Sequence, residues 1–266
     1  MKRAGIVRLL VLLVAFDLGT VAVAMAQPAS PPSSRAEDVF TYYYRDPRPE
    51  RLVGWFDGFG RKRPDWVAYP PVAGFFAIVF ATQPGWIEKL VPAQLNARQA
   101  DTISAALRLS GQAASRDLQA RLAQAGTDRT LTAQFSGLPD RLTNLRIASP
   151  THLDILWGAS FASGDGRYAR MIADFLARTA NRSETIALDV TRIATAASRG
   201  DFSSLAQLKE KYEPGLLLEM VYAGTAAWAL TSNARQHAFV DGVVTRYIAD
   251  HSGTPAAKVL STLKGA

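Results

Sequence analysis

The sequence predicts an all-α protein made of stacked antiparallel helical hairpins. Three observations lead to this prediction. Apolar residues recur at intervals of three and four, which is the spacing of an amphipathic helix. Prolines stand at the expected helix starts and glycines at the expected helix ends. Alternating, strand-like runs are rare. Because short links make neighbouring helices antiparallel, we expect either a compact bundle or a short TPR-like α-solenoid.

The first 26 residues have the organisation of a secretory signal peptide. The basic residues Lys2, Arg3 and Arg8 precede an apolar run over residues 9–16. Ala24-Met25-Ala26 fits the small-x-small rule for cleavage after Ala26. Asp17 disfavours a membrane span, since a charge near its centre costs about 2.5–3.5 kcal/mol. We therefore expect a periplasmic or secreted protein.

The remaining chain is divided by composition. Residues 27–35 are rich in proline and serine and predict a flexible leader. Residues 36–266 predict a single α-helical domain. Its apolar stripes are Met171 and Phe175; Val190, Ile193, Ala194 and Ala197; Leu216, Met220, Ala223, Ala227 and Leu230; and Phe239, Val243 and Tyr247.

Start and stop signals define the expected helices. The proline starts are Pro71, Pro139, Pro150 and Pro255, and the glycine ends are Gly111, Gly126, Gly200 and Gly253. The apolar segment 68–80 could be a buried strand, but its two prolines favour a helix. Residues 129–136 alternate weakly, and we expect a loop there.

The tetrapeptide Asn-Ala-Arg-Gln occurs at 96–99 and again at 233–236. Asn at an N-cap with Gln three residues later is a variant of the capping box, so both copies predict a helix start. A helix would then end near Leu230 and the next begin near Asn233. A sequence duplication is the alternative, but the flanking residues do not align.

Composition excludes several kinds of chemistry. The 266 residues contain no cysteine and three histidines, and no two histidines stand four apart. We expect no metal site and no cofactor. A net charge of +7 is mild for 266 residues, and a nucleic-acid role would need a clustered patch, so we expect no nucleic-acid binding. Ser160, in Gly158-Ala159-Ser160, lacks the strand–turn–helix context of a nucleophile elbow, so these small residues predict close helix packing. Ser163-Gly164-Asp165-Gly166 predicts a turn.

Three carboxylates stand among apolar residues, namely Asp154, Asp189 and Glu219. A buried carboxylate can be an acid or base with a shifted pKa, or the ion-pair partner of an arginine. Arginine outnumbers lysine in this chain, which favours ion pairs between helices. The catalytic interpretation, a hydrolase or lyase acting on an envelope polymer, stays open as the alternative.

Two groups of residues are candidates for binding. Asn233, Gln236 and His237 share one helix face, and they form either a polar recognition patch or, as we favour, a hydrogen-bond network at a helix junction. Arg61, Lys62 and Arg63 stand near Phe59 and Trp66. This basic and aromatic segment suggests weak contact with an anionic membrane surface, but we favour a solvated loop, because three charges make a small footprint.

Three stretches of the sequence carry a resemblance to other proteins. They are Trp228-x-Leu230-x-Ser232-Asn233-Ala234-x-Gln236-His237, Leu156-Trp157-Gly158-Ala159-Ser160-Phe161-x-Ser163-Gly164-Asp165-x-Arg167-Tyr168, and Phe75-Phe76-Ala77 with Phe80 and Pro84-x-Trp86. Together they resemble an uncharacterised group of exported or envelope-associated bacterial helical proteins. The resemblance implies a mostly helical fold and no particular activity. With many capped helices and no catalytic constellation, we expect a module that binds an envelope protein or peptide.

Overall fold

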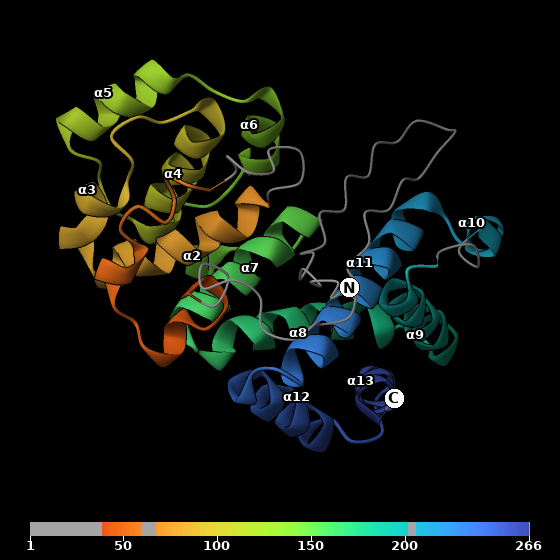
Figure 1. The fold of residues 1–266 in the computed structure, drawn as a ribbon. Helices are drawn as coiled ribbons and strands as arrows, with labels where there is room; N and C mark the ends of the chain where they lie inside the picture. The colour runs from red at the N-terminus through yellow and green to blue at the C-terminus, as the bar shows by residue number, and fades with distance from the viewer. Residues whose placement is uncertain (1–38, 60–67, 202–205, 266) are drawn as a thin grey trace, which may run out of the picture. The chain divides into compact units, whose positions relative to one another are not determined.

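The computed structural model describes residues 39–59, 68–201 and 206–265, and these residues confirm the all-α prediction. No strand occurs among them. The chain divides into two compact units, one containing Pro32–Gly164 and the other Asp165–Ala266 (Figure 1). We call them the N-terminal and C-terminal units and describe each by itself.

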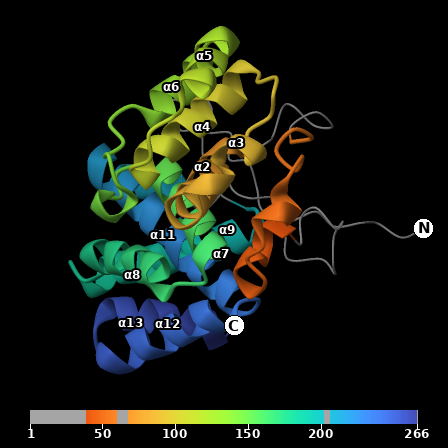
Figure 2. The ribbon, with the colours of Figure 1, turned by 90° about the vertical axis from the view of Figure 1, so that its left-hand side faces the viewer.

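The N-terminal unit is built around helix α2 (Tyr69–Thr82). This helix contacts α4 (Ala97–Ser110) and α7 (Pro150–Ser163), and it lies between them (Figure 2). Helices α5 (Arg116–Ala125) and α6 (Arg129–Phe135) pack on α4. The shorter elements are η1 (Tyr43–Arg45), η2 (Pro49–Leu52), η4 (Pro84–Trp86), α3 (Ile87–Leu90) and η5 (Leu142–Asn144).

Helix α2 supplies much of the core of this unit. Pro70 and Pro71 lie in its first turn, as the helical interpretation of 68–80 requires, and nearly all of its side chains are buried. Its phenylalanines contact rings from the segment before it. Phe75 stacks on Phe40 with ring centroids 4.7 Å apart, and Phe76 meets the edge of Phe56 at 5.3 Å. Such ring pairs add roughly 0.5–1.5 kcal/mol each beyond their buried area.

Two glycines allow α2 and α7 to approach each other at backbone distance. A Cβ atom on Gly158 would lie 1.7 Å from the carbonyl oxygen of Pro71, and one on Gly74 would lie 1.9 Å from that of Ile155. Neither position therefore tolerates any side chain without moving a helix. Ser160, two residues along, is buried and donates to the Leu156 carbonyl oxygen at 2.9 Å. The small residues of 158–160 thus serve packing, as the sequence predicts.

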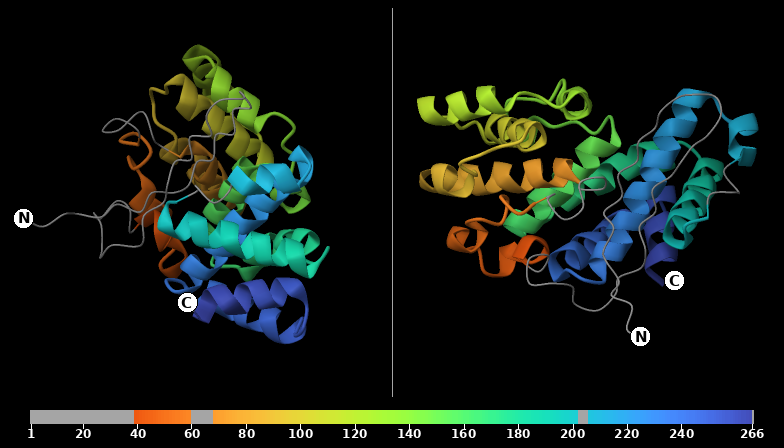
Figure 3. Two further views of the ribbon diagram at one scale, coloured as in Figure 1. Left: turned by 90° about the vertical axis from the view of Figure 1, so that its right-hand side faces the viewer. Right: turned by 45° about the horizontal axis from the view of Figure 1, so that its top comes forward.

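The C-terminal unit is a bundle around its longest helix. It contains α8 (Gly166–Ala180), α9 (Glu184–Arg199), α10 (Leu208–Lys211), α11 (Pro214–Ala234), α12 (Ala238–Asp250) and α13 (Pro255–Gly265) (Figure 3). Helix α11 contacts α8, α9, α12 and α13, and α13 also contacts α8 and α9. In a solenoid each repeat contacts only its neighbours in sequence. This unit is therefore a compact bundle.

Several predicted helix limits are confirmed. Helix α9 buries Val190, Ile193, Ala194 and Ala197, starts after the Ser183 cap and ends at Gly200, which has a left-handed backbone. Asn96 and Gln99 form both hydrogen bonds of the predicted capping box at the start of α4. Between α7 and α8, Gly164 is left-handed and Asp165 caps α8, as expected of a turn.

Other local predictions are wrong. Residues 129–135 form α6 instead of a loop, because the Asp128 side chain accepts from the N–H groups of Thr130 and Leu131. No helix begins at Pro139. On α12 the buried residues are Val240, Val244 and Tyr247, so the apolar stripe is displaced by one residue from Phe239 and Val243.

The glycine crossing yields a first prediction. Replacing Gly158 with alanine should lower the free energy of unfolding of the N-terminal unit by about 3 kcal/mol, because the new methyl group forces α2 and α7 apart. Urea unfolding followed by circular dichroism at 222 nm measures the change. Gly242 of α12 is the control, since a Cβ there meets nothing within 4 Å. Gly242→Ala should stabilise by roughly 0.5–1 kcal/mol. Equal urea midpoints for wild type and Gly158→Ala would contradict the close approach of α2 and α7 at Gly158.

Candidate functional site

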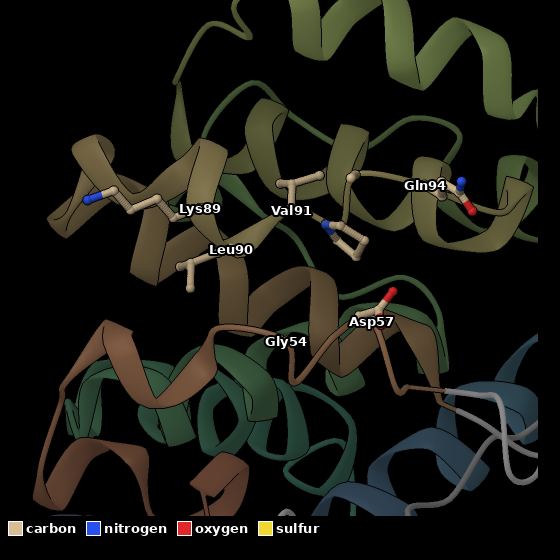
Figure 4. A pocket seen from close by; sticks show the side chains of 8 residues that line it. Gly54, Asp57, Lys89, Leu90, Val91 and Gln94 are labelled. Carbon is tan, nitrogen blue, oxygen red and sulfur yellow. The ribbon is translucent and has the colours of Figure 1, made fainter.

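A pocket of about 540 Å³ lies in the N-terminal unit between two segments of the chain. One wall is the turn 54–57, and the other is the segment 89–94, which includes the end of α3 and the link to α4. The eight lining residues are Gly54, Asp57, Lys89, Leu90, Val91, Pro92, Ala93 and Gln94. In Figure 4, Leu90 points toward the turn and the Asp57 side chain points toward the 89–94 segment.

The turn 54–57 is held in place by its own backbone conformation and by a hydrogen bond from α4. Gly54 has φ +73°, which lets the chain reverse after η2, and the Phe56 ring is fully buried. Gln99 of α4 donates from Nε2 to the Phe56 carbonyl oxygen at 2.8 Å. The Gln99 side chain is fixed in turn, because its Oε1 accepts from the Asn96 N–H in the capping box. The turn is therefore tied to the start of α4 by a buried amide.

The 89–94 wall is held by one arginine. Arg121 of α5 donates from Nη2 to Glu88 Oε2 at 2.5 Å, and from Nη1 to the carbonyl oxygens of Pro92 at 2.9 Å and Val91 at 3.4 Å. Ser115, the N-cap of α5, donates to the other Glu88 oxygen at 2.5 Å. An arginine suits this position because its planar fork presents several donors at fixed angles.

The lining combines buried apolar residues with exposed residues that are mostly polar. Leu90, Val91 and Pro92 are buried, whereas Lys89, Ala93 and Gln94 are exposed. Asp57 is the one carboxylate among the eight lining residues. Hydrolysis of a glycosidic bond needs two carboxyl groups facing each other, roughly 5–9.5 Å apart. The composition of the pocket fits binding better than this kind of catalysis.

The residues 233–237 end a helix instead of forming an open patch. Helix α11 continues through Asn233 to Ala234, so the predicted helix start at Asn233 is wrong. The side-chain amides of Asn233 and Gln236 donate back to the carbonyl oxygens of Ala229 and Ser232. His237 is 1% exposed, and its ring centroid lies 5.8 Å from that of Phe239. The structure thus brings the three predicted residues together as a helix terminus.

The other predicted binding residues, Arg61, Lys62 and Arg63, lie outside the described residues, as do the signal peptide and the leader. Within the described ranges, no group of three or more histidine, aspartate or glutamate side chains could hold a metal ion. No helix in these ranges is long and apolar enough to cross a membrane.

Two of the three carboxylates are ion-paired. Glu219 is 47% exposed and accepts from Arg182 Nη2 at 2.6 Å. Asp189 is 1% exposed and accepts from Arg192, Lys211 and Tyr212 at 2.6–2.8 Å. Burial alone would raise the pKa of Asp189, but the hydrogen bonds from Lys211 and Tyr212 and the nearby positive charges outweigh burial and lower it. Both carboxylates support the ion-pair interpretation.

Asp154 differs from these two. It lies on α7 and is 8% exposed, and its carboxyl group has no hydrogen-bond or ion-pair partner among the described residues. Burial therefore raises the pKa of Asp154 well above its usual value. Burial thus disfavours the charged form of this carboxyl group in the folded protein.

This burial predicts a pH-dependent stability. Between the unfolded pKa, about 3.9, and the raised folded pKa, the folded protein binds more protons than the unfolded chain. Its free energy of unfolding should therefore fall as the pH rises through this window. Asp154→Asn should be more stable than wild type at pH 8, by about 1.4 kcal/mol for each unit by which the folded pKa is raised, and equal to it below pH ~4.

Thermal melts at pH 3.5, 6 and 8 measure the difference. Asp189→Asn provides a control of opposite sign, because it removes a carboxylate that the fold stabilises in its charged form. It should be less stable than wild type at pH 8. A wild-type melting temperature that stays level with that of Asp154→Asn at every pH would show that Asp154 is solvated.

None of the eight lining residues was a candidate from the sequence. The pocket arises where helical spacing is interrupted, between Pro84 and Asn96, and its walls come from segments more than thirty residues apart. The one local signal was the capping box at Asn96, whose Gln99 also reaches Phe56. That long-range hydrogen bond cannot be read from a capping motif.

Comparison of the chain with protein-family models, with curated proteins and with solved structures finds no match.

Proposed function

We propose that this protein is an exported helical module that binds an extended segment of an envelope protein or peptide in the 54–57/89–94 pocket. The observation that supports the proposal most is that both walls of the pocket are fixed by side chains that do not line it, Gln99 on one wall and Arg121 on the other. A preformed site loses little conformational entropy on binding, so more of the contact energy contributes to affinity.

The dimensions and chemistry of the pocket fit a short peptide segment. Its volume of about 540 Å³ lies within the range of roughly 300–1,000 Å³ that is usual for ligand sites. The buried residues Leu90, Val91 and Pro92 offer an apolar surface for one side chain. Val53, which precedes the Gly54 turn, is one of two large hydrophobic residues exposed in the described ranges, at 53%.

A pair of variants tests this proposal. A phage-displayed library of random heptapeptides is panned on the full mature chain, and the enriched peptides are measured by isothermal titration calorimetry. Ala93→Trp should weaken their affinity at least about tenfold, because Ala93 is exposed and lines the pocket, so that the indole ring takes up the space of the ligand. Ala133→Trp, at an exposed position on α6 outside the lining, should leave affinity unchanged.

Two results would contradict peptide binding in this pocket. One is a library from which no peptide is enriched. The other is a set of peptides that bind wild type, Ala93→Trp and Ala133→Trp equally well.

Export is tested separately. The sequence of residues 1–26 predicts that expression in a bacterial host yields a periplasmic or secreted chain beginning at Gln27. Intact mass and N-terminal sequencing of the protein from the periplasmic fraction measure this. Ala26→Arg should retain the segment, because cleavage requires a small residue there. A cytoplasmic product that still begins at Met1 would rule out the signal peptide.

A further inference from the structure

The peptide group between Pro92 and Ala93 has a fixed direction. Arg121 Nη1 donates to the Pro92 carbonyl oxygen at 2.9 Å. The described chain contains no cis peptide bond, and in a trans peptide group the C=O and N–H point in opposite directions. The Ala93 N–H is therefore turned away from the Arg121 guanidinium.

This N–H is available to a ligand. Ala93 is exposed and lines the pocket, whereas Arg121 is not among the lining residues. The Ala93 N–H donates no hydrogen bond to any described residue. Ala93, a lining residue, thus has a backbone donor with no partner among the described residues, and Arg121 fixes the peptide group from its carbonyl side.

The arginine contacts explain why this orientation is stable. A single guanidinium group reaches the carboxylate of Glu88 and the carbonyl oxygens of two consecutive residues, Val91 and Pro92. Its side chain is largely shielded, with 24% exposed. A lysine can keep the ion pair with Glu88, but one ammonium group does not reproduce this planar set of contacts.

We infer that Arg121 is a positioning residue, which turns the Ala93 N–H into the pocket so that it donates a hydrogen bond to a main-chain carbonyl oxygen of a bound extended polypeptide. This inference rests on the proposed function and adds how the ligand is recognised. Pairing with the ligand's main chain is how many domains bind extended segments of varied sequence.

The experiment uses the full mature chain labelled with ¹⁵N. The probe is the blocked pentapeptide acetyl-Ser-Val-Ser-Val-Ser-amide, and its matched control replaces both valines with the corresponding hydroxy acid. The two esters that this creates are weaker hydrogen-bond acceptors and lack the two valine N–H donors, while the side chains stay the same. The amide probe should shift the Ala93 N–H signal and slow its hydrogen exchange. The ester probe should bind about two- to tenfold more weakly, since one hydrogen bond contributes roughly 0.5–1.5 kcal/mol.

Two variants separate positioning from stability. Arg121→Lys should abolish the protection of the Ala93 N–H and weaken the amide probe to the affinity of the ester. Ser115→Ala removes another contact to Glu88 but keeps the Arg121–Pro92 hydrogen bond, so binding should match wild type even where its stability is lower.

The outcomes distinguish this inference from the proposed function. Shifts at Leu90 and Val91 with equal affinity for both probes, or wild-type affinity in Arg121→Lys, would overturn the role of the Ala93 N–H and leave peptide binding in place. An amide probe that shifts no pocket signal would overturn both.

Discussion

The N-terminal unit depends on the contact between two helix backbones at Gly74 and Gly158. At this crossing the carbonyl oxygens of Ile155 and Pro71 occupy the space that side chains would otherwise fill. The close approach brings α7 onto the buried face of α2, whose rings contact Phe40 and Phe56. Phe56 also belongs to the turn that forms one pocket wall. The position of that wall is therefore linked to the crossing through the ring packing.

The sequence predicts the class of the fold and many of its elements, because helices depend on local spacing and on caps. The stripe on α9, the prolines of α2 and the capping box at Asn96 are all confirmed. The small residues around Ser160 are also confirmed as packing residues. Each of these features is determined by a few residues that are close together in the sequence, so it can be predicted from the sequence.

Prediction from local spacing fails where contacts with residues far away in the sequence determine the structure. The tetrapeptide Asn-Ala-Arg-Gln starts a helix at 96–99 and lies at the end of one at 233–236. The first copy follows a non-helical link, so its Asn side chain is available to cap. The second begins inside the last turn of the long apolar helix α11, where the Asn233 amide donates to the carbonyl oxygen of Ala229. The pocket has the same origin, since Gln99 and Arg121 reach residues 43 and 29 positions away.

The residues that hold the walls of the pocket in place differ from the residues that line it, which matters for substitutions at this site. Its outline depends on Gln99, which holds the Phe56 carbonyl oxygen, and on Arg121, which holds those of Val91 and Pro92, and neither residue lines the pocket. The exposed lining residues are Lys89, Ala93 and Gln94, and the Lys89 ammonium lies 4.7 Å from the centre of the Trp86 ring. Under the proposed function, the shape of the pocket and its selectivity for a ligand depend on separate sets of positions. Exchange of the exposed lining residues would then change the ligand preference while the residues that hold the walls stay the same.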